Sequence, residues 1–160
     1  MTKRKAFNTC IILALIIVCG LYFYPKPLSS IFSKGERISI EYSHYSSENG
    51  KPIVDSTVYQ FDSNADGYFD IVKLFEQYNY HSNVISLFKS TSIDFTSSGV
   101  DYSFNIYNEY HDISTFIAMG GTGKILVNGH LYSMGFCGNK YQIEFMEQLK
   151  GILEDNQQAN

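Results

Sequence analysis

The sequence is poor in the residues that build disulfide scaffolds, collagen-like chains and nucleic-acid-binding surfaces. It contains no Trp, and only 3 Cys and 3 Pro among 160 residues, which excludes the first two classes. Basic residues number 12 against 16 acidic ones, for a net charge of −4, so binding to nucleic acid is not expected. Tyr and Phe are abundant instead, with 13 and 12 residues, and this composition favours β-structure.

Residues 1–24 are predicted to be a membrane anchor or a signal segment. Three basic residues at 3–5 precede an uncharged run at 6–24, which is close to the roughly 20 residues that cross a bilayer. Aromatic residues end this run, as is typical at a membrane interface, and Pro25 then stops a helix. The basic start favours a cytoplasmic N-terminus. We therefore expect a single-pass protein of the cell membrane, with its C-terminal domain outside the cytoplasm.

Two alternatives also place the rest of the chain outside the cytoplasm. A signal peptide cleaved near Gly20 would release a secreted domain. A lipoprotein signal would put lipid on Cys19, although Val18 stands where such signals carry a small residue. Cys137 is the only cysteine beyond the apolar run, so no disulfide within the exported domain is expected.

The remaining chain is predicted to be a linker at 25–36, one α+β domain at 37–155 and a frayed tail at 156–160. Alternating polar and apolar residues from Ile38 indicate a strand, and Asn49-Gly50 followed by a second such run indicates a hairpin. Apolar residues then recur every three or four positions, which predicts a helix at about 68–78. Residues 81–99 are rich in Ser and ambiguous.

The second half is predicted to contain four strands and a helix. Alternation and turn residues place a meander of strands at 102–106, 113–119, 124–127 and 130–134, followed by an amphipathic helix at 139–154. The predicted fold class is therefore α+β: an N-terminal transmembrane helix, then an antiparallel sheet made of a hairpin and a four-strand meander, packed by two helices. The side chains expected in its core include Ile40, Tyr42, Phe104, Ile106, Ile143, Met146 and Leu149.

Residues 62–70 carry the one specific ligand motif of the sequence, D-x-N-x-D-G-x-x-D. Calcium prefers six to eight hard oxygen ligands, which closely spaced carboxylates, amides and backbone carbonyls supply. The candidate ligands are the side chains of Asp62, Asn64, Asp66 and Asp70 and the backbone carbonyl of Tyr68.

This stretch resembles the calcium loops of EF-hand and dockerin modules and of integrin-type propeller repeats. The resemblance covers nine residues and implies a calcium ion with a structural role. Lys73 stands at the twelfth position, where an EF-hand carries a bidentate Glu, so the EF-hand pattern is incomplete. The alternative is a turn rich in Asp and Asn that caps the helix after it.

No catalytic residues are expected. The segment GGTGK at 120–124 is similar to a phosphate loop, but Ala118 and Ile125 occupy the positions of its first Gly and its Ser or Thr, so we interpret it as a hairpin turn. His130 and Cys137 lie close in sequence without a group that would orient them. Several tyrosines of the second half fit either a core or a recognition surface, with core the first reading: Tyr102, Tyr107, Tyr110, Tyr132 and Tyr141.

The layout as a whole indicates a tethered domain without enzymatic chemistry. A basic start, an apolar run, a short linker and a cysteine-poor domain resemble the small membrane-anchored or lipoprotein-like α+β domains of bacteria, a resemblance that implies no activity. We expect a non-catalytic binding or accessory domain with a protein or envelope partner, stabilised by calcium if the 62–70 loop binds it. The alternatives are an immunity or inhibitor-type protein that blocks a toxin or enzyme and, more remotely, a small exported hydrolase.

Overall fold

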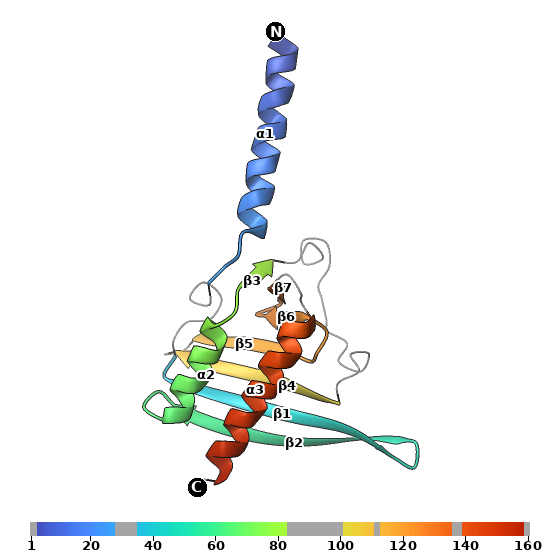
Figure 1. Cartoon of the computed structure of the whole chain (residues 1–160), viewed down its shortest axis with the longest axis vertical. Coiled ribbons are helices and arrows are strands. Elements are labelled where there is room, and N and C mark those ends of the chain that lie inside the picture. The colour runs from blue at the N-terminus through green and yellow to red at the C-terminus, as the bar shows by residue number, and fades with distance from the viewer. Residues whose placement is uncertain (1–2, 28–34, 83–100, 111–112, 136–138, 159–160) are drawn as a thin grey trace.

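The protein is described by a computed structural model that covers residues 3–27, 35–82, 101–110, 113–135 and 139–158. Three helices and seven strands follow one another along the chain (Figure 1). They are α1 (Lys3–Phe23), β1 (Arg37–Glu48), β2 (Lys51–Asp62), α2 (Asp66–Glu76), β3 (Tyr80–Ser82), β4 (Tyr102–Tyr110), β5 (Ile113–Met119), β6 (Lys124–Val127), β7 (His130–Met134) and α3 (Asn139–Gln158).

The seven strands form one antiparallel sheet, in the order β2-β1-β4-β5-β6-β7-β3. The predicted hairpin is β1–β2, and the predicted meander is β4 to β7. Helices α2 and α3 lie side by side against one face of the sheet (Figure 1). The α+β prediction, with an antiparallel sheet packed by two helices, is therefore confirmed.

The β1–β2 hairpin follows directly from its turn residues. Asn49 and Gly50 have φ angles of 53° and 76°, the left-handed conformation that a two-residue type I′ turn needs in both positions. Glu48 and Lys51 are the first pair of the ladder on either side of this turn. The turn thereby fixes the register of all 12 residue pairs between the two strands.

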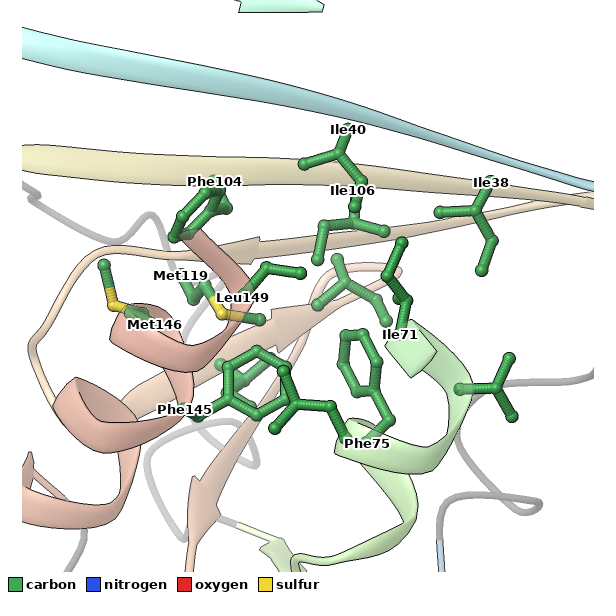
Figure 2. Packing of buried hydrophobic residues seen from close by; sticks show 14 of the residues in the cluster. Ile38, Ile40, Ile71, Phe75, Phe104, Ile106, Met119, Phe145, Met146 and Leu149 are labelled. Atoms are coloured by element: carbon green, nitrogen blue, oxygen red, sulfur yellow. The ribbon is translucent and has the colours of Figure 1, made fainter. Parts of the chain in front are cut away.

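The core lies between the sheet and the two helices that cover it. Phe75 of α2 meets Phe145 of α3 edge to face, with ring centroids 4.8 Å apart, and Figure 2 shows Ile71 and Phe75 pointing toward the side chains of the sheet. Of the seven residues predicted to be in the core, Tyr42 and Ile143 are only partly buried. The other five are fully buried: Ile40, Phe104, Ile106, Met146 and Leu149.

Helix α1 points away from the rest of the molecule (Figure 1). The prediction of an N-terminal helix is confirmed, but its description as transmembrane is not. Within the described residues, no helix is both long enough and apolar enough to cross a membrane.

Lys26, near the start of the predicted linker, contacts the domain. The backbone N–H of Lys26 donates to the carbonyl of Tyr80 at 2.8 Å, and the N–H of Tyr80 donates back at 3.3 Å. The ammonium of Lys26 also lies over the ring of Tyr132, 5.7 Å from its centroid. This bridge joins the end of α1 to β3, the edge strand at one side of the sheet.

Two further differences concern lengths. Helix α3 continues to Gln158, beyond the predicted end at residue 154 and into the tail that was expected to fray. Strand β3 has three residues, too few for a periodic pattern, and it was not predicted. Cys137 and most of the ambiguous stretch at 81–99 lie outside the described residues.

Candidate functional site

Most of the large hydrophobic side chains that are exposed in the described chain lie on α1. Successive residues of an α-helix are 100° apart, so the exposed run at 11–13 and 15–18 covers every side of the helix. Large apolar patches in contact with water mark contact sites for membranes or proteins. The exposed side chains are those of Phe7, Ile11, Ile12, Leu13, Leu15, Ile16, Ile17, Val18 and Leu21.

In the first half of the predicted calcium loop, Asp62 forms an ion pair and Asn64 is exposed. The guanidinium Nε of Arg37 donates to Oδ1 of Asp62 at 2.9 Å, an exposed ion pair that raises the pKa of Arg37, first through this hydrogen bond and then through the charge of Asp62. The carbonyl of Asp62 accepts from the N–H of Ala65 at 2.9 Å. Asn64 lies exposed in the turn that follows.

The second half of the loop is the first part of α2. Asp66 is the first residue of the helix, where a carboxylate interacts favourably with the helix dipole. The buried Tyr68 donates its hydroxyl to the carbonyl of Gly35 at 2.7 Å, and Asp70 pairs with Lys73 at 3.7 Å. The four side chains among the predicted ligands are all exposed, and calcium binding here stays a prediction.

The alternative interpretation, a turn whose Asp and Asn side chains cap the helix, differs from the structure. Ala65 is the N-cap of α2, and it has no side-chain capping bond, so the Asx residues do not cap the helix in the predicted way. Among the described residues, no group of three His, Cys, Asp or Glu side chains is placed to hold a metal ion.

A groove beside α3 combines aromatic and charged side chains. It has a volume of about 280 Å³ and is lined by Tyr102, Glu147, Lys150, Gly151 and Glu154. The ammonium of Lys150 lies 5.6 Å from the centroid of the Tyr102 ring and 3.8 Å from Glu154. Burial, followed by the carboxylate of Glu147, raises the pKa of Tyr102 to about 12.

This groove was not predicted from the sequence. Its helical members are spaced by three or four residues, so they lie along one side of α3, and that spacing was the available signal. Their meeting with Tyr102 depends on the way α3 crosses the sheet, which a one-dimensional pattern does not contain.

A second cavity lies where α2, β3, β7 and α3 converge, close to the attachment of α1. It has a volume of about 260 Å³, and its wall includes Tyr78 and Tyr141, whose rings meet edge to face 6.3 Å apart. Burial raises the pKa of Tyr78. The remaining lining residues are Gln77, Asn79, His81 and Gly135.

The predicted hairpin turn at 120–123 is confirmed, because it connects β5 to β6 and has positive φ angles at Gly121 and Gly123. The buried side chain of Gln142 on α3 holds this turn. Its amide nitrogen donates to the carbonyl of Lys124 at 2.8 Å, and its oxygen accepts from the N–H of Gly123. The turn is therefore a packing site for α3.

The remaining candidates from the sequence are dispersed. His130 is exposed at the start of β7, and Cys137 lies outside the described residues. Tyr107 is exposed, and the side chain of Tyr110 is not described. The other three tyrosines pack against the core, as expected: Tyr102, Tyr132 and Tyr141.

Comparison of the chain with protein-family models, with curated proteins and with solved structures finds no match.

Proposed function

We propose that the protein is a membrane-tethered, non-catalytic binding domain, held outside the cytoplasm by α1. The observation that carries this proposal is the exposure of apolar side chains on every side of α1. A helix of a globular domain buries an apolar stripe against its core, whereas a helix that is apolar all round needs an apolar environment. The length of the tether rests on the sequence, in which the uncharged run extends from residue 6 to residue 24.

A lipid bilayer is the apolar environment that the exposed side chains of α1 favour energetically. Removing one large aliphatic side chain from water stabilises it by about 1.5–3 kcal/mol. The exposed side chains of α1 together amount to a driving force on the order of 10 kcal/mol. The helix satisfies its own backbone hydrogen bonds, as a segment inside lipid must.

The attachment of α1 supports a tether that positions its domain. The paired backbones of Lys26 and Tyr80 join the end of the tether to β3. The edge of the sheet that carries β3 therefore lies next to the membrane in this proposal. An acidic domain is repelled from an anionic membrane surface, so we expect the rest of the sheet to extend away from the bilayer.

Flotation of the full chain with lipid vesicles tests the tether. Leu13→Arg combined with Ile16→Arg should release the chain from the vesicles, because charges within the apolar run are costly in lipid. The matched control is Val54→Arg combined with Val58→Arg, which adds the same charges at equally exposed apolar positions of β2. Leu13 and Ile16 are 52% and 61% exposed, and Val54 and Val58 are 54% and 60% exposed.

The control chain should float with the vesicles as the wild type does. The proposal that α1 anchors the protein is refuted if the wild-type chain stays in the soluble fraction, or if the two double variants are released from the vesicles to the same extent.

An immunity or inhibitor-type protein is the second candidate, and the groove at Tyr102 favours it. Tyr is enriched at protein interfaces. The two carboxylates that line this groove, Glu147 and Glu154, outnumber the ammonium of Lys150, and this charge balance suits a basic surface on a target. Titration of a purified candidate toxin with the wild type and with Glu147→Gln separates this function from a purely structural tether.

A further inference from the structure

Strand β2 is a long edge of the sheet. It has 12 residues, and among the described strands it is hydrogen-bonded to β1 alone. The opposite edge, β3, has three residues and is bridged by Lys26. Edge strands offer unpaired backbone groups to other chains, and most proteins protect them.

The register of the hairpin shows which backbone groups of β2 face outward. Glu48 and Lys51 flank the two-residue turn and form a hydrogen-bonded pair. Hydrogen-bonded and non-hydrogen-bonded pairs then alternate along the ladder. The N–H and C=O groups of Val54, Ser56 and Val58 therefore point away from β1. Pro52 also stands at an outward position, where its missing N–H costs no bond to β1.

The side chains of this edge leave it accessible. Val54 and Val58 are exposed on the sheet face opposite the helices, since they share that face with their cross-strand partners Tyr45 and Glu41. Ser56 lies between them and is within 2.9 Å of the hydroxyl of Ser43. Asp55 is the only charged residue from 53 to 60, and it is exposed.

We propose that β2 binds an extended strand of a second protein, which adds to the sheet as an eighth strand. The complementary strand has apolar residues opposite Val54 and Val58, a small residue opposite Ser56 and a basic residue opposite Asp55. Backbone bonds to the outward groups provide affinity, and the alternating side chains provide specificity. This proposal rests on the proposed function, because the position of β2 relative to the membrane determines which partner reaches it.

That position favours a partner away from the membrane surface. The tether joins the sheet at β3, and β2 is the opposite edge (Figure 1). Six strand spacings of about 4.8 Å separate the two edges, or roughly 29 Å along the sheet. In the tethered protein, β2 is therefore the edge that is presented to the space beyond the membrane.

The same geometry disfavours a second copy of this chain. Two β2 strands that pair antiparallel are related by a two-fold axis perpendicular to the sheet. This axis would turn the tether of the second copy to the opposite end of a continuous sheet, pointing away from the first tether (Figure 1). Both helices would not enter the same bilayer in that arrangement.

Titration of the full chain in lipid nanodiscs with two synthetic peptides tests the proposal. The first peptide, Thr-Val-Thr-Ser-Lys-Val-Thr, places Lys opposite Asp55 in antiparallel pairing, and the second carries Glu in place of that Lys. We expect the Lys peptide to bind about threefold or more tightly than the Glu peptide, because cross-strand charge pairs contribute up to about 1 kcal/mol. Asp55→Lys should reverse this preference.

Ser56→Pro removes one outward N–H, and Ser56→Ala is its matched control, because both variants lose the hydroxyl group. We expect Ser56→Pro to weaken binding of the Lys peptide about fivefold relative to Ser56→Ala, the equivalent of one hydrogen bond of about 1 kcal/mol. If Ser56→Pro does not fold, the charge reversal at Asp55 decides the question alone.

Three results would overturn the proposal: no binding of either peptide at millimolar concentration, equal binding by the two Ser56 variants, or a dimer of the chain that forms through β2. Failure of the tether is recognised separately. If the chain does not float with vesicles, the same titration is made with the chain in solution, where binding with the expected preference would retain the docking edge and refute the anchor.

Discussion

Leu149 offers the sharpest test of the packing between α3 and the sheet. Its side chain is fully buried, and Figure 2 shows it between α3 and the sheet, close to Met119 and Met146. Leu149→Ala removes buried methyl groups and leaves a cavity, because the paired strands beneath it hold the sheet in place. Changes of this kind lower the free energy of unfolding by about 2–5 kcal/mol.

Urea unfolding of the full chain in nanodiscs, followed by the near-ultraviolet circular dichroism of its tyrosines, measures this cost. With a slope of about 1–3 kcal/mol per molar urea, we expect the midpoint to fall by roughly 1 M or more at unchanged slope. The control is Val58→Ala at an exposed position, which should change the free energy of unfolding by less than about 0.5 kcal/mol. Equal midpoints for the two variants would refute the assignment of Leu149 to the core.

Three further predictions concern the pKa of Tyr102, the hydroxyl of Tyr80 and the predicted calcium loop. The pKa of Tyr102 is raised to about 12 in the folded protein. The contribution of this tyrosine to stability is therefore complete below pH 10 and is lost as the pH rises toward 12. Urea midpoints across this pH range should fall less steeply in Tyr102→Phe than in the wild type. Tyr80 donates its buried hydroxyl to the carbonyl of Phe75 at 2.8 Å. Tyr80→Phe should therefore lower the free energy of unfolding by about 0.5–1.5 kcal/mol. An unchanged urea midpoint would contradict a contribution of this hydrogen bond to stability. The calcium hypothesis for residues 62–70 predicts a higher melting temperature in calcium than in chelator, and Asp66→Ala should remove the difference; equal melting in both would leave this segment as the entry to α2.

Local patterns were enough to predict most of the sheet. Alternation around Ile38 and Ile106 follows from a strand with one face on the core, and the Asn49-Gly50 turn has the conformation that its residues favour. The helix near Phe75 was predicted from spacing alone, and its apolar face is buried. These features depend on neighbours within a few residues, so a single sequence contains them.

The features that escaped prediction depend on contacts between distant residues. Strand β1 pairs with β4, which lies about 60 residues further along the chain, as the cross-strand pair of Tyr42 and Phe104 shows. The bridge from Lys26 to Tyr80 is a single residue pair and leaves no periodic signal. The bond between Arg37 and Asp62 changes the reading of the calcium motif, because it engages the first predicted ligand in an ion pair across the hairpin.

The central claim, a domain held outside the cytoplasm by α1, is tested most directly by its topology in cells. An enzyme that is active only outside the cytoplasm can be fused after Asn160 of the full chain, and a matched fusion can place the same enzyme before Met1. Because the basic residues at 3–5 favour a cytoplasmic N-terminus, we predict activity for the C-terminal fusion and none for the N-terminal one. An inactive C-terminal fusion that accumulates to the same level would contradict the account.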